Sequence, residues 1–347
     1  MRINHDITIE PNQSFEIDLF RPEDARGIAH LFYAIYGSAY PIETYYMPDR
    51  ITEENQKGNI YSIVGRTEKG DIIAHGAMYR SSPPNRDLYE GGQYLVLPSY
   101  RKTFAIYKIN RYIFDILIPR LSIDGIYGES VCNHIISQKI ASRSEAADVA
   151  IEIDVMPQEA YTKEQSASGR VSCIIQIHPY NDSKQEVFIP SLYREEIDYI
   201  LSDLNIQRTI TYSTEPIPCD IKSNISVNFF PYASVGRFNV IMGGSDFDMV
   251  LEDLEQKGRD NNTLIFQFFI NLGKPWAGRI IEKLRKKGYF LGGYIPAWFK
   301  NDGILMQKTL TIPDFNSIKL YTEKAKKLLE IIKSDREQSV NESGLTH

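Results

Sequence analysis

The stretch Glu90-Gly-Gly-Gln-Tyr-Leu-Val-Leu-Pro-Ser-Tyr-Arg101-Lys-Thr-Phe-Ala-Ile-Tyr-Lys-Ile-Asn-Arg111 combines a strand pattern with a helix pattern. The apolar run at 94–97 predicts a strand that ends at Pro98, and apolar residues between 104 and 117 recur at helical spacing. The first N–H groups of a helix have no partner within the helix, and the helix dipole makes this end attractive to a phosphate. The turn at 99–103 adds basic residues there. The same residues also fit an ordinary strand–turn–helix unit with a solvated basic turn.

The residues Leu95-Val96-Leu97-Pro98-Ser99-Tyr100-Arg101 resemble the acyl-CoA-binding segment of the GNAT superfamily of N-acyltransferases. In that family a strand is followed by Pro-x-Tyr-Arg and then by a glycine-rich turn that holds the CoA pyrophosphate. This chain has the strand and the arginine, but Lys102, Phe104 and Ile106 stand where the family usually has small residues. Side chains at those positions make a close approach of the backbone to a ligand harder. The family also often has a glutamate eleven residues before the arginine, and here that residue is Glu90 (101 − 90 = 11).

The composition describes a globular chain long enough for two domains of ordinary size, since it has 347 residues of which 42% are hydrophobic and 24% charged. A net charge of −6 disfavours nucleic acid as the main partner. The three cysteines are widely spaced, which fits reduced thiols rather than a disulfide framework. The sequence has no apolar run long enough to span a membrane and no secretory signal at its start, so we expect a cytoplasmic protein.

The first half of the chain has its strand and helix patterns in the order found in GNAT domains. Helices are predicted to follow residues 24, 103 and 134, and strands are predicted at 15–20, 61–66, 71–80, 94–97, 125–131 and 149–155. The opening Arg21-Pro22-Glu23-Asp24 also resembles the start of many GNAT domains. The segment 37–48 is rich in tyrosine. In the family this region borders the acceptor substrate, and a loop packed on the core is the alternative.

The second half contains what looks like a repeat of the first. Asn133 and Asn271 each follow a predicted strand and are 138 residues apart, and Pro157 and Pro296 each end the next strand and are 139 residues apart. We therefore expect an α/β (α+β) protein of two tandem GNAT-like domains, each with a mixed central sheet flanked by helices. The expected parts are an N-terminal acyl-CoA-binding domain at 1–165, a degenerate C-terminal domain at 166–335 and a polar tail at 336–347.

The two predicted domains differ at the strand-to-helix turn. The second turn, at 242–248, carries Asp246 and Asp248, which cap a helix themselves and would repel a pyrophosphate. We expect the second domain to lack a cofactor site and to form one wall of the acceptor pocket. A last helix is predicted from Phe315 onward, and the polar residues 334–347 are predicted to fray.

The GNAT resemblance implies acyl transfer from a CoA thioester to an amine. The ammonium must lose a proton before its nitrogen attacks, and the thioester oxygen must be polarised. In the family a backbone N–H of the central strand polarises that oxygen, which here implies Val96 or a neighbour. Glu90 is the first candidate base and His134 the second. Tyr161 is the candidate acid for the thiolate, since the helix after 134 lacks the tyrosine often used in the family.

Each catalytic candidate has a structural alternative: a solvated strand end for Glu90, a histidine bonded to the loop backbone for His134, and a core position for Tyr161. Ser137 could cap its helix instead of binding a ligand. No cluster of His, Cys and carboxylate residues has metal-ligand spacing, so no metal is expected. The residues expected to bind the acyl-CoA are Leu95, Val96, Leu97, Arg101, Lys102, Thr103, Phe104, Ala105, Asn133 and Ser137.

The sequence leaves three functions open. The first is an acyl-CoA-dependent N-acyltransferase, with a nucleotide-linked (dTDP or UDP) amino-deoxy sugar as the favoured small-molecule acceptor, because tandem GNAT-like chains resemble such enzymes. The second is an aminoacyl-transfer enzyme of the cell-wall bridge type, which the acidic balance disfavours because it needs a face that binds tRNA. The third is a non-catalytic GNAT-like scaffold, which the missing glycines favour.

Overall fold

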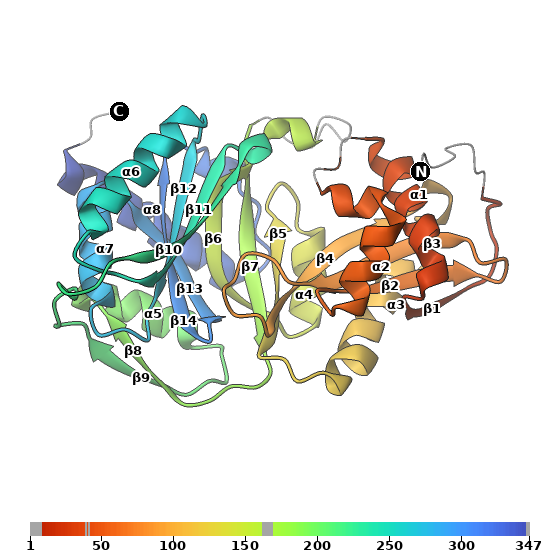
Figure 1. Ribbon diagram of the computed structural model, residues 1–347, viewed down its shortest axis with the longest axis horizontal. Helices are drawn as coiled ribbons and strands as arrows, with labels where there is room; N and C mark the ends of the chain where they lie inside the picture. The colour runs from red at the N-terminus through yellow and green to blue at the C-terminus, as the bar shows by residue number, and fades with distance from the viewer. Residues whose placement is uncertain (1–8, 39, 41, 162–168, 345–347) are drawn as a thin grey trace. The chain divides into compact units, whose positions relative to one another are not determined.

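The computed structural model describes residues 9–38, 40, 42–161 and 169–344. They form two compact units: the first is made of residues up to 82 together with 89–126, and the second of 83–88 together with 127 onward. The α/β class expected from the sequence is confirmed, since strands and helices pack together in both units (Figure 1). The domain boundary at 165 was predicted from the repeat in the sequence and does not coincide with the limits of these two units. It stays a prediction.

The first unit is built on antiparallel strands in the order β1-β2-β3-β4. These strands are β1 (Phe15–Leu19), β2 (Ile60–Thr67), β3 (Ile72–Tyr79) and β4 (Leu88–Val96), and the helices are α1 (Ala25–Tyr36), α2 (Pro48–Gln56) and α3 (Ala105–Arg111), which a π-helical turn at Tyr112–Leu117 extends.

Helices cover both faces of β3, which explains why nearly all its residues are buried. Successive residues of a strand point to opposite faces. The ring of His75 contacts Phe32 of α1, whereas the next residue, Gly76, lies against Ile109 of α3. Helices α1 and α3 therefore lie on opposite sides of the sheet.

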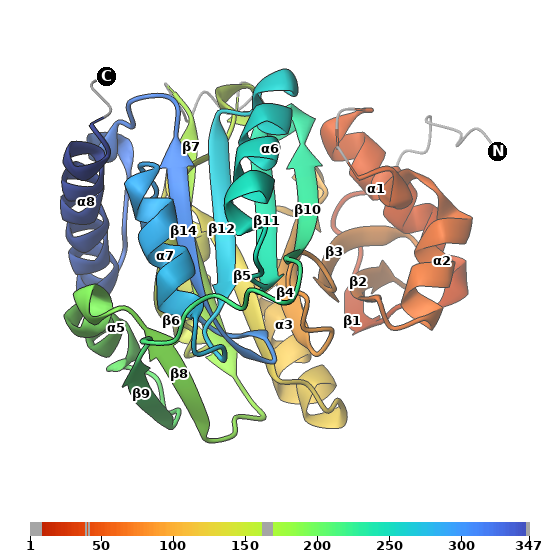
Figure 2. The same cartoon turned by 60° about the vertical axis from the view of Figure 1, so that its left-hand side comes forward.

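The second unit contains a mixed sheet in the order β5-β7-β6-β13-β14-β12-β11-β10, in which β11 and β12 are parallel (Figure 2). Its strands are β5 (Gly125–Val131), β6 (Ala147–Met156), β7 (Val171–Pro179), β10 (Asn224–Phe230), β11 (Val235–Met242), β12 (Ile265–Asn271), β13 (Phe290–Phe299) and β14 (Asn301–Thr309), with a separate parallel pair β8 (Gln185–Ile189) and β9 (Arg208–Tyr212). Its helices are α4 (Ile136–Arg143), α5 (Arg194–Leu201), α6 (Phe247–Asp260), α7 (Ala277–Lys286) and α8 (Glu323–Ser343).

The repeat seen in the sequence is present in the structure as two copies of one strand–helix–strand–strand unit. The first copy is β5-α4-β6-β7 with strand order β5-β7-β6, and the second is β12-α7-β13-β14 with strand order β12-β14-β13. The copies meet where β13 pairs antiparallel with β6, Gly293 opposite Ala150. A Cβ at Gly293 would lie 2.3 Å from the Val149 oxygen, so this join requires a residue without a side chain.

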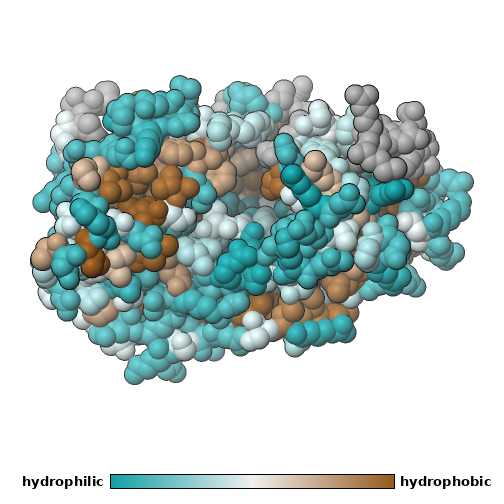
Figure 3. Space-filling model, in the orientation of Figure 1, coloured by the Kyte–Doolittle hydropathy of each residue, from teal (hydrophilic) through white to brown (hydrophobic). Residues whose placement is uncertain are grey.

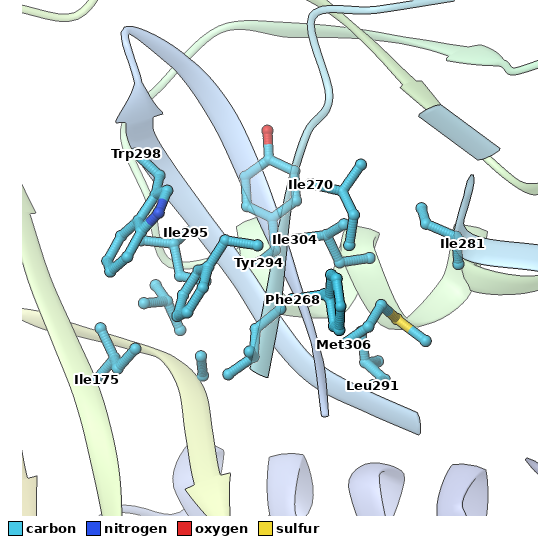
Figure 4. Packing of buried hydrophobic residues seen from close by; sticks show 14 of the residues in the cluster. Ile175, Phe268, Ile270, Ile281, Leu291, Tyr294, Ile295, Trp298, Ile304 and Met306 are labelled. Carbon is cyan, nitrogen blue, oxygen red and sulfur yellow. The ribbon is translucent and has the colours of Figure 1, made fainter. Parts of the chain in front are cut away.

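The core of the second unit is dominated by large side chains from the second copy (Figure 4). Phe269 stacks on Trp298 with ring centroids 4.1 Å apart, and the ring centroids of Phe238 and Phe268 are 4.7 Å apart. Burial of such aromatic and aliphatic groups is the main favourable contribution to folding.

The C-terminal helix differs from the sequence-based expectation. Helix α8 begins at Glu323 instead of near Phe315, and the Thr322 hydroxyl caps it by accepting from the Ala325 N–H. The expectation that residues 334–347 fray is wrong as far as residue 343, because α8 continues to Ser343. Asp335 is buried there and accepts a hydrogen bond from the Leu291 N–H.

None of the helices within the described residues is long and apolar enough to cross a membrane. The same residues contain no group of three or more His, Cys, Asp or Glu side chains that could hold a metal ion.

Candidate functional site

Strand β4 of the first unit contains a bulge where the quoted stretch begins. His75 pairs with Leu95 and Ala77 pairs with Gly92, so two residues of β4, Gln93 and Tyr94, lie opposite one residue of β3. Gln93 has a φ of 56°, in the left-handed region that normally favours glycine. Such a strained residue persists only when its surroundings fix it.

Two side chains hold Gln93 in this conformation. The Tyr45 hydroxyl donates to Oε1 of Gln93, and Nδ1 of His75 lies 3.0 Å from its backbone oxygen. Tyr45 is itself fixed by stacking on Phe32, with ring centroids 4.3 Å apart and an angle of 15° between the rings. The bulge is therefore tied to the aromatic surface of α1 and to β3.

A cluster of aromatic rings packs beside the bulge. Phe32, Tyr36, Tyr40 and Tyr45 contact one another with centroid distances between 4.3 and 6.3 Å. Burial raises the pKa of the Tyr40 hydroxyl, and the neighbouring Tyr36 and Glu90 raise it further. Tyr36 ends α1. Tyr40 and Tyr45 come from the 37–48 segment, which the sequence predicted to border the acceptor or to pack on the core.

Glu90 lies two residues before Gly92 on β4 and is half-buried. Tyr79, directly opposite on β3, donates its hydroxyl hydrogen to Oε1 of Glu90. Gly92 leaves room for this contact, since a Cβ there would lie 3.0 Å from the Tyr79 hydroxyl. The first candidate base is thus held in place by a partner and is not a freely solvated strand end.

The turn after β4 is exposed and basic. Tyr100 is buried and anchors the turn by donating to the Glu10 oxygen at 2.7 Å. Thr103 donates to the Tyr100 oxygen at 2.7 Å and accepts from the Ala105 N–H at 3.3 Å, so it closes the turn onto α3. Arg101 and Lys102 are exposed, and neither forms an ion pair with any residue that the structure describes.

Phe104 does not fill this turn. Its side chain is 75% exposed and lines a surface groove of about 510 Å³ with Tyr107, Arg111, Tyr112 and Ile116. Figure 3 shows an apolar patch in this area, where Figure 1 draws the gold helical segment after α3. Phe104 therefore borders the turn, although the GNAT family usually has a small residue at this position.

The remaining predicted residues of β4 lie in the sheet. Leu95 is buried opposite His75, Val96 is half-buried opposite Ala74, and Leu97 is buried with its N–H donating to the Ile73 oxygen at 2.9 Å. Ala105 is the buried first residue of α3. Glu90, the residues 95–97 and the turn therefore form one continuous stretch in the first unit.

The other predicted residues lie at the end of β5 in the second unit. Nδ1 of His134 accepts from the Ile136 N–H at 3.3 Å, the bond expected of a histidine that holds its loop. Asn133 is buried and Ser137 is half-buried in the first turn of α4. Tyr161 ends a short 3₁₀ turn, and its side chain lies outside the described residues. The roles predicted for these residues stay predictions.

The turn before α6 at 242–248, where the sequence predicted no cofactor site, is filled by another segment of the same chain. The Ser245 N–H donates to the Ile221 oxygen at 2.9 Å, the Gly244 N–H donates to Oγ of Ser223 at 3.0 Å, and the Ser223 N–H donates to Asp246 at 2.8 Å. The segment 221–223 therefore occupies the space before α6.

The sequence prediction missed the bulged residue Gln93, His75 that holds it, and Tyr79 that holds Glu90. Two signals pointed toward them. The pair Gly91-Gly92 inside a strand pattern is typical of a bulge. His75 is a histidine among the apolar and small residues of Ile72–Tyr79, which marks a buried polar group in need of partners.

No family model matches the chain, and no curated protein matches it. Among solved structures, the ribosomal-protein-S5-alanine acetyltransferase from Vibrio fischeri is similar over 51% of this chain and 98% of its own, with 12% identity and a TM-score of 0.39. An N-acetyltransferase from Staphylococcus aureus Mu50 is similar over 48% of this chain and 98% of its own, with 13% identity and a TM-score of 0.38. The protein yncA from Salmonella typhimurium is similar over 49% of this chain and 96% of its own, with 13% identity and a TM-score of 0.39. Its structure contains its cofactor acetyl-CoA. These similarities are too low to establish a family or an activity for this chain.

Proposed function

We propose that this protein is an N-acyltransferase that moves an acyl group from acyl-CoA to a primary amine. The observation that carries the proposal is the bulged strand β4, which runs from the tyrosine-held Glu90 into an exposed basic turn. This arrangement puts a carboxylate, a strand with redirected peptide groups and two cations on one continuous stretch. These are the groups that the transfer of an acyl group from a phosphate-bearing thioester needs.

The turn at 98–104 suits the pyrophosphate of an acyl-CoA. Arg101 and Lys102 are exposed cations, and Phe104 leaves the turn open because its side chain lies along the groove beside it. Thr103 and Ala105 would complete this site, whereas Asn133 and Ser137, which the sequence also named for acyl-CoA binding, lie in the second unit. Acyl-CoA supplies the activated carbonyl carbon of the reaction.

In the proposed reaction, Glu90 accepts a proton from the ammonium, and the freed nitrogen attacks the carbonyl carbon. A backbone N–H at or near Val96 donates to the carbonyl oxygen as negative charge develops on it. The new C–N bond forms and the C–S bond breaks. The leaving thiolate takes a proton from Tyr161 or from water, and the second proton that the nitrogen loses restores that donor. His134 is the second candidate for the base.

The favoured acceptor is the amine of a nucleotide-linked amino-deoxy sugar. What supports this choice is the row of tyrosine rings beside Glu90, because flat amphipathic rings suit stacking on a base or a sugar. The filled turn before α6 supports the expectation that the predicted C-terminal domain has no acyl-CoA site of its own. The cytoplasmic location expected from the sequence stays a prediction.

Isothermal titration with CoA and acetyl-CoA tests the proposal. Arg101→Ala should weaken binding about 10- to 100-fold, because a hydrogen bond to a charged group contributes about 1.5–3 kcal/mol. Lys57→Ala is the matched control, since Lys57 is an exposed cation of the first unit that pairs with Glu53 of α2 away from the turn. Absence of binding by the wild type would contradict the proposal. Binding would be followed by mass spectrometry of amino-sugar nucleotides incubated with acetyl-CoA.

A further inference from the structure

We infer that His75 is a positioning residue for acyl transfer: its imidazole fixes the bulged peptide of β4 and thereby the direction of the β4 N–H groups that polarise the thioester. The inference rests on the proposed function. It concerns a buried side chain that touches neither the acyl-CoA turn nor Glu90 in the contacts described above.

The first step is the direction of the hydrogen bonds around His75, which the chemistry of the partners determines. The Gln93 backbone oxygen can only accept, so Nδ1 of His75 carries the hydrogen. In a neutral imidazole Nε2 must then accept, and the Ser62 hydroxyl 3.1 Å away is its donor. The imidazole is fully buried, which favours its neutral form.

The second step is what holds Ser62. Asn55 of α2 donates from Nδ2 to the Ser62 hydroxyl oxygen at 3.3 Å and accepts from the Ser62 N–H at 2.8 Å. The hydroxyl hydrogen of Ser62 is therefore free to point at His75. A single directed chain of hydrogen bonds runs from α2 through β2 and β3 to the carbonyl of Gln93.

The third step links this chain to the peptide groups of β4. A trans peptide is planar, and its C=O and N–H point in opposite directions. The Gln93 C=O and the Tyr94 N–H belong to the same peptide, so holding the oxygen toward His75 aims the Tyr94 N–H away from it. Gln93 is in a left-handed conformation that a glutamine adopts only under constraint. Without His75 this peptide could turn, and it would carry Leu95 and Val96 with it.

The expected effect is on the chemical step more than on binding. A misplaced hydrogen-bond donor stabilises the developing oxyanion less, and small errors in position cost up to about a hundredfold in rate. The turn that holds the pyrophosphate is fixed separately, by Tyr100 and Thr103. Loss of His75 should therefore lower kcat about 10- to 100-fold and leave KM for acyl-CoA within about threefold.

Two substitutions separate positioning from packing. His75→Phe keeps the volume of the ring but removes the donor, whereas His75→Asn keeps a donor near the place of Nδ1 but leaves a cavity. A positioning role predicts that His75→Asn retains more activity than His75→Phe. A packing role predicts the reverse order. Ile28→Ala is the stability control, because Ile28 is a buried α1 residue that makes no side-chain hydrogen bond.

The measurements are steady-state kinetics with acetyl-CoA and an amino-sugar nucleotide that the mass spectrometry shows to be acylated, and hydrogen exchange of peptides that cover residues 88–97. The expected result is faster exchange and a low kcat in His75→Phe, with neither effect in Ile28→Ala. Wild-type kcat in His75→Phe, or equal losses in the Phe and Asn variants, would overturn the inference. If the wild type binds no acyl-CoA, the proposed function fails. The exchange data then show separately whether His75 holds the bulge, and unchanged exchange in His75→Phe would refute that as well.

Discussion

His75 is a residue whose protonation opposes folding. Burial lowers its pKa to about 4, against an ordinary value of 6.5. A proton on Nε2 would also break the bond from Ser62, since a doubly protonated imidazole has no acceptor. The folded chain therefore requires the neutral ring, while the unfolded chain binds a proton below about pH 6.5.

This difference gives a prediction for stability against pH. Between about pH 6.5 and pH 4 the unfolded state binds more protons than the folded state, so the contribution of His75 is complete above pH 6.5 and is lost as the pH falls. From pH 7.5 to pH 5, His75 should lower the free energy of unfolding of the first unit by about 2 kcal/mol. His75→Phe should reduce the loss measured by urea unfolding over this range by that amount. An equal loss in the wild type and the variant would contradict the low pKa.

At the scale of elements, the turn before α6 depends on the close approach of two backbone segments. A Cβ at Gly244 would lie 2.4 Å from the carbonyl carbon of Lys222 and 2.5 Å from the Ile221 oxygen. Neither atom is the end of a flexible side chain, so the segment 221–223 would have to move as a whole. Its hydrogen bonds to Gly244, Ser245 and Asp246 would weaken together.

Gly244→Ala should therefore lower the free energy of unfolding of the second unit by about 1–3 kcal/mol, the usual cost of overpacking. Gly169→Ala is the matched control, because a Cβ at Gly169 would meet no atom of the described residues within 4 Å. Chemical denaturation followed by circular dichroism measures both variants. A Gly244→Ala variant as stable as the Gly169→Ala variant would show that the segment can shift without cost.

The elements themselves were largely predictable, because strands and helices follow from local periodicity. The strands predicted at 61–66 and 71–80 are β2 and β3, and the helix predicted after residue 134 is α4. The bulge at Gln93 was not predicted, since its partners His75 and Tyr45 come from distant parts of the sequence. The tail was wrongly predicted to fray for the same reason. Asp335 is a charged residue in a polar segment, and only the fold shows that it is buried and bonded to the N–H of Leu291.

At the scale of the second unit, a buried ion cluster ties the two copies of the repeat together. Arg237 of β11 donates to Glu152 of β6 at 2.6 Å and to Glu129 of β5 at 3.0 Å, and to Gln267 of β12 at 2.9 Å. Burial opposes the charge of Arg237, but the two carboxylates outweigh it and raise its pKa. Glu152 is fully buried, so it depends on this positive partner.

Arg237→Met should lower the free energy of unfolding of the second unit by about 3–5 kcal/mol, because it leaves a buried carboxylate without its cation. Arg194→Met is the control, since Arg194 forms an exposed ion pair with Asp198 on the same helix and should change stability little. Replacing Arg237 and Glu152 together by Met and Gln should recover part of the loss. Equal stability of the two single variants, measured by calorimetry, would contradict the structural role of the cluster.

The duplicated architecture was predictable because paired residues such as Asn133 and Asn271 recur at a nearly constant distance along the chain. How the copies join was not predictable, because Gly293 and Arg237 matter only through neighbours that the fold brings to them. The candidate site divides in the same way. Glu90 and Arg101 were found from a local motif, whereas the residues that orient β4 were found only in three dimensions.

The antiparallel join of β6 and β13 has one more consequence. Two similar units that met as separate chains would have to keep one shared sequence, and their association would weaken on dilution. Here a peptide link holds both copies in the same molecule, so the pairing does not depend on protein concentration. The linked copies are also free to diverge, as where Gly293 of one copy lies opposite Ala150 of the other.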